Sequence, residues 1–197
     1  MAVEMTIPFV TWKKRAIPEG TTEYQWVTET SEDIFAGKRV VVFSLPGAFT
    51  PTCSSTHLPG FEAMYDDVIA QDIDEIYCLS VNDSFVMNAW LDSLSVSKVK
   101  PIADGNGDFT RHMGMLVEKR QVTFGYRSQR YAMVVDNGRI EMIFVEEGKE
   151  DNYEGDPFVV SSVESVLRYL ENVRDLRRAE LGLDEETNED TDSTVSE

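Results

Sequence analysis

The chain has 197 residues, of which 42% are hydrophobic, and it carries a formal net charge of −18 at pH 7. This length suits one domain with a substantial core, and the negative charge argues against nucleic-acid backbones and anionic membranes as partners. No apolar run approaches the roughly 20 residues of a membrane-spanning helix. The first twenty residues lack an apolar h-region, so we expect no secretory signal. The two cysteines, Cys53 and Cys78, cannot form a disulfide framework, so we expect a reducing, cytoplasmic location.

The apolar pattern along the chain predicts strands that alternate with helices. The expected strands cover residues 10–12, 24–27, 39–44, 75–81, 99–103, 130–136 and 139–146. Helices are expected to start at Thr30, near Pro51, after Asn82-Asp83 and at Phe109, and a last amphipathic helix contains Val163 to Leu170. This order predicts a mixed sheet with helices on both faces, which is a thioredoxin-like α/β fold. We assign residues 1–180 to this domain and the acidic residues 181–197 to a disordered tail.

A predicted turn from a strand into a helix contains Cys53. Pro51 suits the first helical position, and Thr50 before it suits the N-cap, where its hydroxyl can accept from a free amide. Cys53 then falls in the first turn, where unpaired N–H groups and the helix dipole favour a thiolate. Pro59 lacks an amide donor and crowds the carbonyl of Ser55, so we expect a kink or local widening of this helix.

A cation beside the sulfur would stabilise the thiolate further. The segment of residues 125–131 contains Arg127 and Arg130 and leads into the predicted hairpin. Either guanidinium could therefore point over the edge of the sheet toward Cys53.

Five stretches of the sequence together resemble one family. They are PGAFTPTCS (residues 46–54), HLPGF (57–61), LSVNDSFVM (79–87), ADGNG (103–107) and RSQRYA (127–132). In this order they are similar to the type II, or type-five, peroxiredoxins, and the resemblance covers about residues 17 to 170. It implies a thioredoxin-like fold and the reduction of hydrogen peroxide and organic hydroperoxides by a cysteine thiolate.

The resemblance also implies roles for single residues. Cys53 would be the peroxidatic nucleophile, Thr50 would hydrogen-bond the peroxide, and Pro46 would shape the turn and shield it from water. Arg127 would hold the thiolate and the peroxide. For Arg130 two roles stay open: it supports the site without touching the peroxide, or it lies on the surface.

Two other chemistries are disfavoured. His57 is not expected to act as the base for the thiol, because a helix dipole and an arginine suffice. A zinc site built from both cysteines and both histidines would lack a close cysteine pair. We therefore expect neither a metal nor a cofactor.

The oxidised cysteine must be reduced by a second thiol. Cys78 is a possible resolving residue, but it lies about 10 Å below the sheet edge by strand geometry, whereas a disulfide needs Cα atoms within about 7 Å. We therefore expect glutathione or glutaredoxin as the reductant, with a Cys53–Cys78 disulfide as the alternative. Animal-type members of the family that the chain resembles carry a resolving cysteine in the loop that corresponds to residues 155–161. This chain has none there, which argues against recycling by thioredoxin alone.

The oligomeric state and the alternative of a partner protein as target stay open. The subfamily often forms homodimers, and Phe49 and Phe85 are candidate contacts if they are not core residues. A redox relay that oxidises a partner protein, docked by the acidic tail, is the alternative function.

Overall fold

The computed structural model describes residues 5–181, so residues 182–197 of the expected acidic tail lie outside the described residues. A central five-stranded sheet has the order β5-β4-β3-β8-β9. Its strands are β3 (Arg39–Ser44), β4 (Glu75–Ser80), β5 (Lys100–Ala103), β8 (Tyr131–Asp136) and β9 (Arg139–Val145). Strands β3, β4 and β5 are parallel, whereas β8 and β9 run antiparallel to their neighbours, so the sheet is mixed as predicted.

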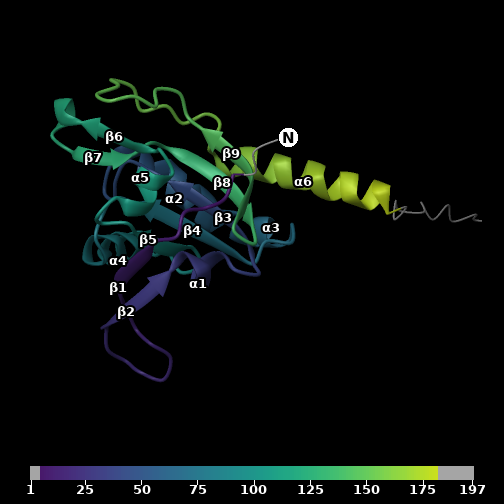
Figure 1. Cartoon of the computed structure of the whole chain (residues 1–197), viewed down its shortest axis with the longest axis horizontal. Helices are drawn as coiled ribbons and strands as arrows, with labels where there is room; N and C mark the ends of the chain where they lie inside the picture. Colours follow the sequence, from purple (N-terminus) through teal and green to yellow (C-terminus); the bar gives the residue numbers. More distant parts are fainter. Residues whose placement is uncertain (1–4, 182–197) are drawn as a thin grey trace, which may run out of the picture.

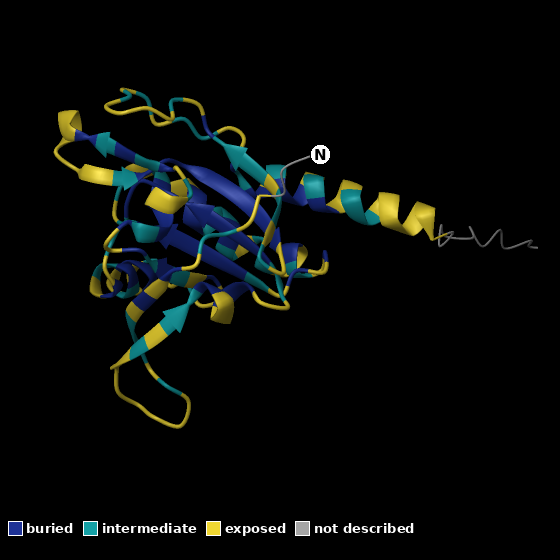
Figure 2. Cartoon of the chain, in the orientation of Figure 1, coloured by how far each residue is buried: buried dark blue, intermediate teal, exposed yellow. Residues whose placement is uncertain are grey.

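Helices cover both faces of this sheet (Figure 1). They are α1 (Ser31–Phe35), α2 (Leu58–Ala63), α3 (Tyr65–Ile69), α4 (Ser84–Ser93), α5 (Asp108–His112) and α6 (Val163–Glu180). Alternate residues of β3 point to opposite faces. Val41 and Phe43 join a core with α2, α3, α4 and α6, whereas Val40 and Val42 join a core with α1 and α5. The predicted α/β layers are therefore confirmed, and the central strands are the most buried part of the chain (Figure 2).

Two hairpins lie outside the central sheet. The first pairs β1 (Thr11–Ala16) with β2 (Gln25–Thr30), and the second pairs β6 (Leu116–Lys119) with β7 (Gly125–Ser128) around the short 3-10 helix η2 (Arg120–Val122). The sequence predicted the first hairpin but not the second, because residues 116–128 mix charged and apolar side chains without a clear period. The second hairpin stands beside the loop that follows β9 (Figure 1).

The starts of α1 and α4 follow the predicted local signals. Thr30 and Asp33 form a reciprocal capping box at the start of α1, and Asp83 caps α4 by accepting from the amides of Phe85 and Val86. The last helix, α6, continues ten residues beyond the predicted stretch and projects from the body, with its distal half largely exposed (Figure 2). Among residues 5–181, no helix is both long enough and apolar enough to span a membrane.

Candidate active site

The turn between β3 and the cysteine helix is fixed by local hydrogen bonds. The amide of Ala48 donates to Asn82 Oδ1 at 3.0 Å, and the hydroxyl of Thr50 donates to the carbonyl of Gly47 at 2.8 Å. The structure shows no backbone amide donating to this hydroxyl, so the expected N-cap bond is absent and its lone pairs are free to accept from another donor. Phe49 has a φ of 63°, a left-handed conformation that costs a non-glycine residue about 1–3 kcal/mol.

Cys53 begins a π-helical turn, η1 (Cys53–His57), which continues directly into α2. The amide of Leu58 donates to the carbonyl of Cys53, five residues back. The local widening predicted from Pro59 is thus confirmed, because this proline cannot donate to Ser55 and the turn opens by one residue. The indole of Trp90 in α4 donates to Ser54 Oγ at 3.0 Å and holds the widened turn against the core.

Arg130 makes the contact with the sulfur. Its Nη1 atom lies 3.6 Å from Cys53 Sγ, and its Nη2 atom pairs with Asp156 at 2.6 Å. Cys53 and Arg130 are both buried, with exposed fractions of 0% and 2%. A guanidinium at this distance in a buried site stabilises a thiolate through a charge-assisted hydrogen bond.

His57 holds the same guanidinium from the other side. Its Nε2 atom lies 3.1 Å from the carbonyl of Ser161, which can only accept, so Nε2 carries the proton and Nδ1 accepts from Arg130 at 3.1 Å. Burial, followed by the charge of Arg130, lowers the pKa of His57 to about 3. The imidazole is therefore neutral at physiological pH, and its remaining lone pair is already used, so it orients Arg130 and does not take the thiol proton.

Arg127 occupies a different place from the one expected. Its guanidinium donates to the carbonyls of Val81 and Phe124 at 3.2 and 3.1 Å, and Nη1 lies 3.3 Å from where a Cβ on Gly47 would be. The structure thus places Arg127 against the outside of the active-site turn, while Arg130 contacts the sulfur. The pairing of β8 with β3 explains why Arg130 contacts the sulfur. Arg130 directly precedes β8, and the first residue of β8 pairs with the last residue of β3, next to the cysteine turn.

Cys78 lies within the sheet, opposite Phe43 in β3 and Pro101 in β5. It is fully buried, and burial, with a smaller contribution from the charge of Cys53, raises the pKa of its thiol well above the ordinary value. Pro46 is also buried and, with Thr50, lines a cleft of about 520 Å³ between the active-site turn and the loop of residues 153–156.

Comparisons with known proteins agree with this geometry. A family model described as Redoxin matches residues 13–166. The chain is 51% identical to peroxiredoxin y4vD of Sinorhizobium fredii over 92% of this chain and 97% of that protein, and 46% identical to hybrid peroxiredoxin hyPrx5 of Haemophilus influenzae over 83% of this chain and 64% of that one. It resembles the crystal structure of reduced Prx3 in complex with H2O2 from Vibrio vulnificus with a TM-score of 0.75, at 37% identity over 88% of this chain and 98% of that one. The chain belongs to the peroxiredoxin family.

This peroxiredoxin is a thiol peroxidase of the thioredoxin-like fold, and its relatives fit the type II subfamily. Sequence reasoning found the cysteine turn but missed Asp156 and the orienting contact of His57. One signal could have favoured Arg130 over Arg127: it directly precedes the apolar run 131–135, which had to enter the sheet beside β3.

Proposed function

We propose that this peroxiredoxin reduces hydrogen peroxide and organic hydroperoxides through a sulfenic acid on Cys53. The single observation that supports this most is the guanidinium of Arg130 at 3.6 Å from Cys53 Sγ, at the first turn of a helix. The thiolate sulfur attacks the terminal peroxide oxygen and forms an S–O bond. The O–O bond breaks, its electron pair leaves as alkoxide or hydroxide, and protonation of that oxygen gives an alcohol or water.

The surrounding groups support this displacement by following the moving charge. Arg130 holds the sulfur before attack and can donate to the peroxide oxygens as charge passes to them. Thr50, whose hydrogen is directed to Gly47, has lone pairs that can accept from the peroxide O–H. Pro46 covers the turn and limits access of water. We assign Arg127 a supporting role, since its contacts are with the backbone around the turn.

A pair of arginine variants tests this assignment. Arg130→Ala should lower kcat/KM for hydrogen peroxide by about 100- to 1000-fold, which is the loss usually seen when one charge-stabilising donor is removed. Arg127→Ala, the matched control, should lower it by less than about tenfold, because its contacts lie outside the reacting atoms. The measurement is the rate of Cys53 oxidation in competition with horseradish peroxidase, with folding checked by circular dichroism. Wild-type kcat/KM in Arg130→Ala would remove this residue from the mechanism.

We also propose that an external thiol, glutathione or glutaredoxin, reduces the Cys53 sulfenic acid, with thioredoxin as the less favoured donor. The raised pKa of Cys78 keeps that thiol protonated at neutral pH, and a protonated thiol is a poor nucleophile. Cys78 also lies inside β4, between β3 and β5, where the backbone is paired on both sides and leaves the thiol little freedom to move toward Cys53.

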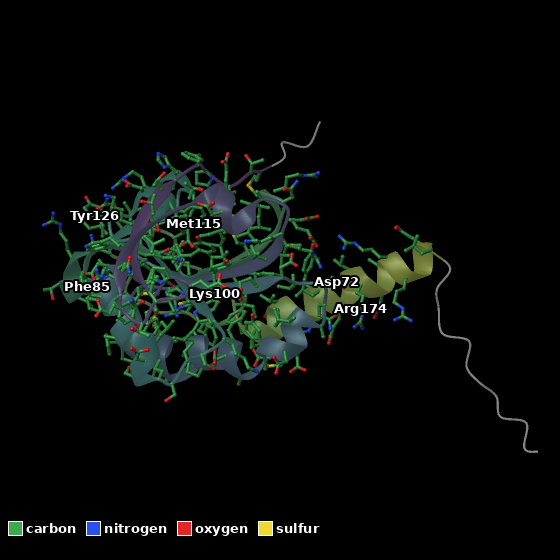
Figure 3. The ribbon with its side chains drawn as sticks, turned by 90° about the horizontal axis from the view of Figure 1, so that it is seen from below. Asp72, Phe85, Lys100, Met115, Tyr126 and Arg174 are labelled. Carbon is green, nitrogen blue, oxygen red and sulfur yellow. The ribbon has the colours of Figure 1, made fainter. Side chains whose placement is uncertain are left out.

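We also propose that the protein forms a homodimer and that it is cytoplasmic. Phe49 and Phe85 are 58% and 60% exposed, so neither belongs to the core, and the segment of Asn82 to Phe85 lies beside the active-site turn. Phe85 and Tyr126 lie at the same end of the molecule, away from Arg174 on α6 (Figure 3). This exposed apolar surface near the active site supports association through that end.

A further inference from the structure

Glu146 is a buried carboxylate that directly follows β9. It is 3% exposed, and its Oε1 atom accepts from the amides of Val159, Val160 and Ser161 and from the hydroxyl of Ser161, each at 2.8 Å. A glutamate is rarely buried unless its oxygens are paired, and these four bonds meet that requirement. They also fasten the end of β9 to a stretch of backbone 13 to 15 positions further along the chain, just before α6.

The stretch that Glu146 holds is also the stretch that contacts His57. The carbonyl of Ser161 accepts from His57 Nε2 at 3.1 Å, and Ser161 is fully buried. Three positions earlier, the ring centre of Phe158 lies 4.8 Å from that of the imidazole and 5.8 Å from the guanidinium carbon of Arg130. This stretch therefore decides where the imidazole lies, and the imidazole in turn accepts from Arg130 Nη1 at 3.1 Å.

The main chain of Glu146 fixes the other end of Arg130. The amide of Glu146 donates to the carbonyl of Arg130 at 3.1 Å, and the carbonyl of Glu146 accepts from Gln129 Nε2 at 2.9 Å. Glu146 thus contacts the backbone of Arg130 directly. Its side chain reaches the guanidinium through Ser161 and His57. Both ends of the arginine are therefore held relative to a single point at the end of β9.

The remaining contacts of the Arg130 guanidinium restrain it less. Asp156 accepts from Nη2 at 2.6 Å, but its side chain is 49% exposed, so solvent weakens this pair. Nε is buried and has no hydrogen-bond partner among residues 5–181. The contact with His57 is buried on both sides, so water does not compete with it. The route through Ser161 and His57 is therefore the firmer restraint on the guanidinium.

We propose that Glu146 is a positioning residue for the thiolate of Cys53. Its carboxylate fixes the carbonyl of Ser161, and this carbonyl fixes the imidazole of His57. The imidazole then holds Nη1 of Arg130 beside the sulfur. The place of the acceptor oxygen is what matters, because the four bonds of the carboxylate go to the stretch before α6 and act on the sulfur only indirectly. This inference rests on the proposed peroxidase function and adds a residue to its machinery.

Two substitutions in the full-length protein separate the place of the acceptor oxygen from its charge. Glu146→Gln keeps an acceptor oxygen at the same distance from the main chain, so oxidation of Cys53 by hydrogen peroxide should stay within about threefold of wild type. Glu146→Asp keeps the charge but withdraws the oxygen by one carbon–carbon bond, so the rate should fall about tenfold or more. Glu147→Asp, at the exposed neighbouring glutamate, is the matched control and should behave as wild type. Competition with horseradish peroxidase measures the rate, and circular dichroism checks folding.

A pH profile shows whether the effect reaches the sulfur. In Glu146→Asp, the ultraviolet absorbance of the Cys53 thiolate should titrate about half a pH unit or more higher than in wild type, because the guanidinium is held less firmly beside it. The titratable and charged groups that face the sulfur or its guanidinium partner are the same in this variant; they are Arg130, His57, Asp156 and Cys78. In Glu147→Asp the titration should coincide with that of wild type.

A double variant shows whether the effect passes through Arg130. Residues that act as one unit lose activity non-additively. Adding Glu146→Asp to Arg130→Ala should therefore lower the remaining rate by less than about twofold, since the guanidinium that Glu146 positions is already absent.

Contrary results would overturn the proposal in distinct ways. A wild-type rate and titration in folded Glu146→Asp would show that the position of the carboxylate does not matter. An undiminished further loss in the Arg130→Ala background would make Glu146 a support of the fold as a whole. A loss of rate in Glu146→Gln would make its charge decisive, and this outcome overturns the proposal even if Glu146→Asp does not fold. Failure of the wild type to reduce hydrogen peroxide would instead refute the proposed function itself.

Discussion

At the scale of single residues, the site depends on how one guanidinium is held. Arg130 is fixed by Asp156 on one side and by the neutral imidazole of His57 on the other, which directs Nη1 toward Cys53. All three of these side-chain partners are neutral or negatively charged, so the cation is stabilised without a competing positive charge. A protonated His57 would destroy this arrangement, because it would place two cations 3.1 Å apart in a buried site.

This arrangement predicts a pH dependence of stability. Above pH 6.5, His57 is neutral in both the folded and unfolded states and contributes no pH dependence. Between pH 6.5 and about 3, only the unfolded chain binds the proton, so the free energy of unfolding falls as the pH falls. We expect His57 to account for a loss of about 1.4 kcal/mol between pH 7.5 and 5.5.

Urea unfolding of wild type and His57→Gln at the two pH values measures this contribution. The variant should be less sensitive to pH by about that amount, whereas His112→Gln, at an exposed histidine, should behave as wild type. Identical pH dependence in wild type and His57→Gln would contradict a neutral buried His57.

At the scale of elements, the widened turn η1 and the strand β4 set what each cysteine can do. Cys53 lies in a short π-helical stretch that ends two residues before Pro59 and that is held by side-chain contacts of Ser54 with Trp90 and of His57 with the carbonyl of Ser161. Cys78 lies in a strand that is hydrogen-bonded on both sides within the sheet. Opening η1 therefore costs less free energy than displacing β4 from the sheet. An external thiol can reach Cys53 once η1 opens, whereas Cys78 could approach Cys53 only if β4 moved.

We accordingly expect Cys78→Ala and Cys78→Ser to retain at least about half of the wild-type turnover with glutathione and glutaredoxin, because the thiol of Cys78 stays protonated and fixed. Steady-state peroxide consumption is the measurement, and Cys53→Ser provides the inactive control. Complete loss of turnover in folded Cys78→Ala would instead make Cys78 the resolving residue.

At the scale of the whole molecule, the exposed apolar residues are spread over several faces. Phe49, Phe85 and Trp26 are each more than half exposed, and Trp26 packs edge-on against Phe85 at 5.7 Å between ring centres. Leu176, on the projecting part of α6, is also exposed, but Figure 3 shows α6 at the end opposite Phe85. Of these two places, the one with Phe49 and Phe85 adjoins the active-site turn, so association through it would also shelter the site.

Sedimentation velocity tests this arrangement. We expect wild type to sediment as a dimer at micromolar concentration and Phe85→Glu to raise its dissociation constant by about tenfold or more, because a charge would be buried at the interface. Leu176→Glu, at an equally exposed residue of α6, should leave the dimer intact. A monomeric wild type, or dissociation caused only by Leu176→Glu, would rule out this interface.

The sequence by itself determined the local architecture of the cysteine turn. Strand β3, the helix that follows it, the capping of α1 and α4, and the widening before Pro59 all depend on neighbours within about five residues, and the sequence records these neighbours directly. The layered α/β fold followed from the order of such elements.

Only the tertiary structure decided which side chains complete the site. Arg127 and Arg130 differ by three positions, and the choice between them depends on how β7 leaves its hairpin and β8 enters the sheet beside β3. The contact between Cys53 and Arg130 spans 77 positions, and the ion pair that holds Arg130 to Asp156 spans 26. The apolar run after Arg130 favours this residue over Arg127, but the contacts themselves arise from strand pairing and burial across the whole chain.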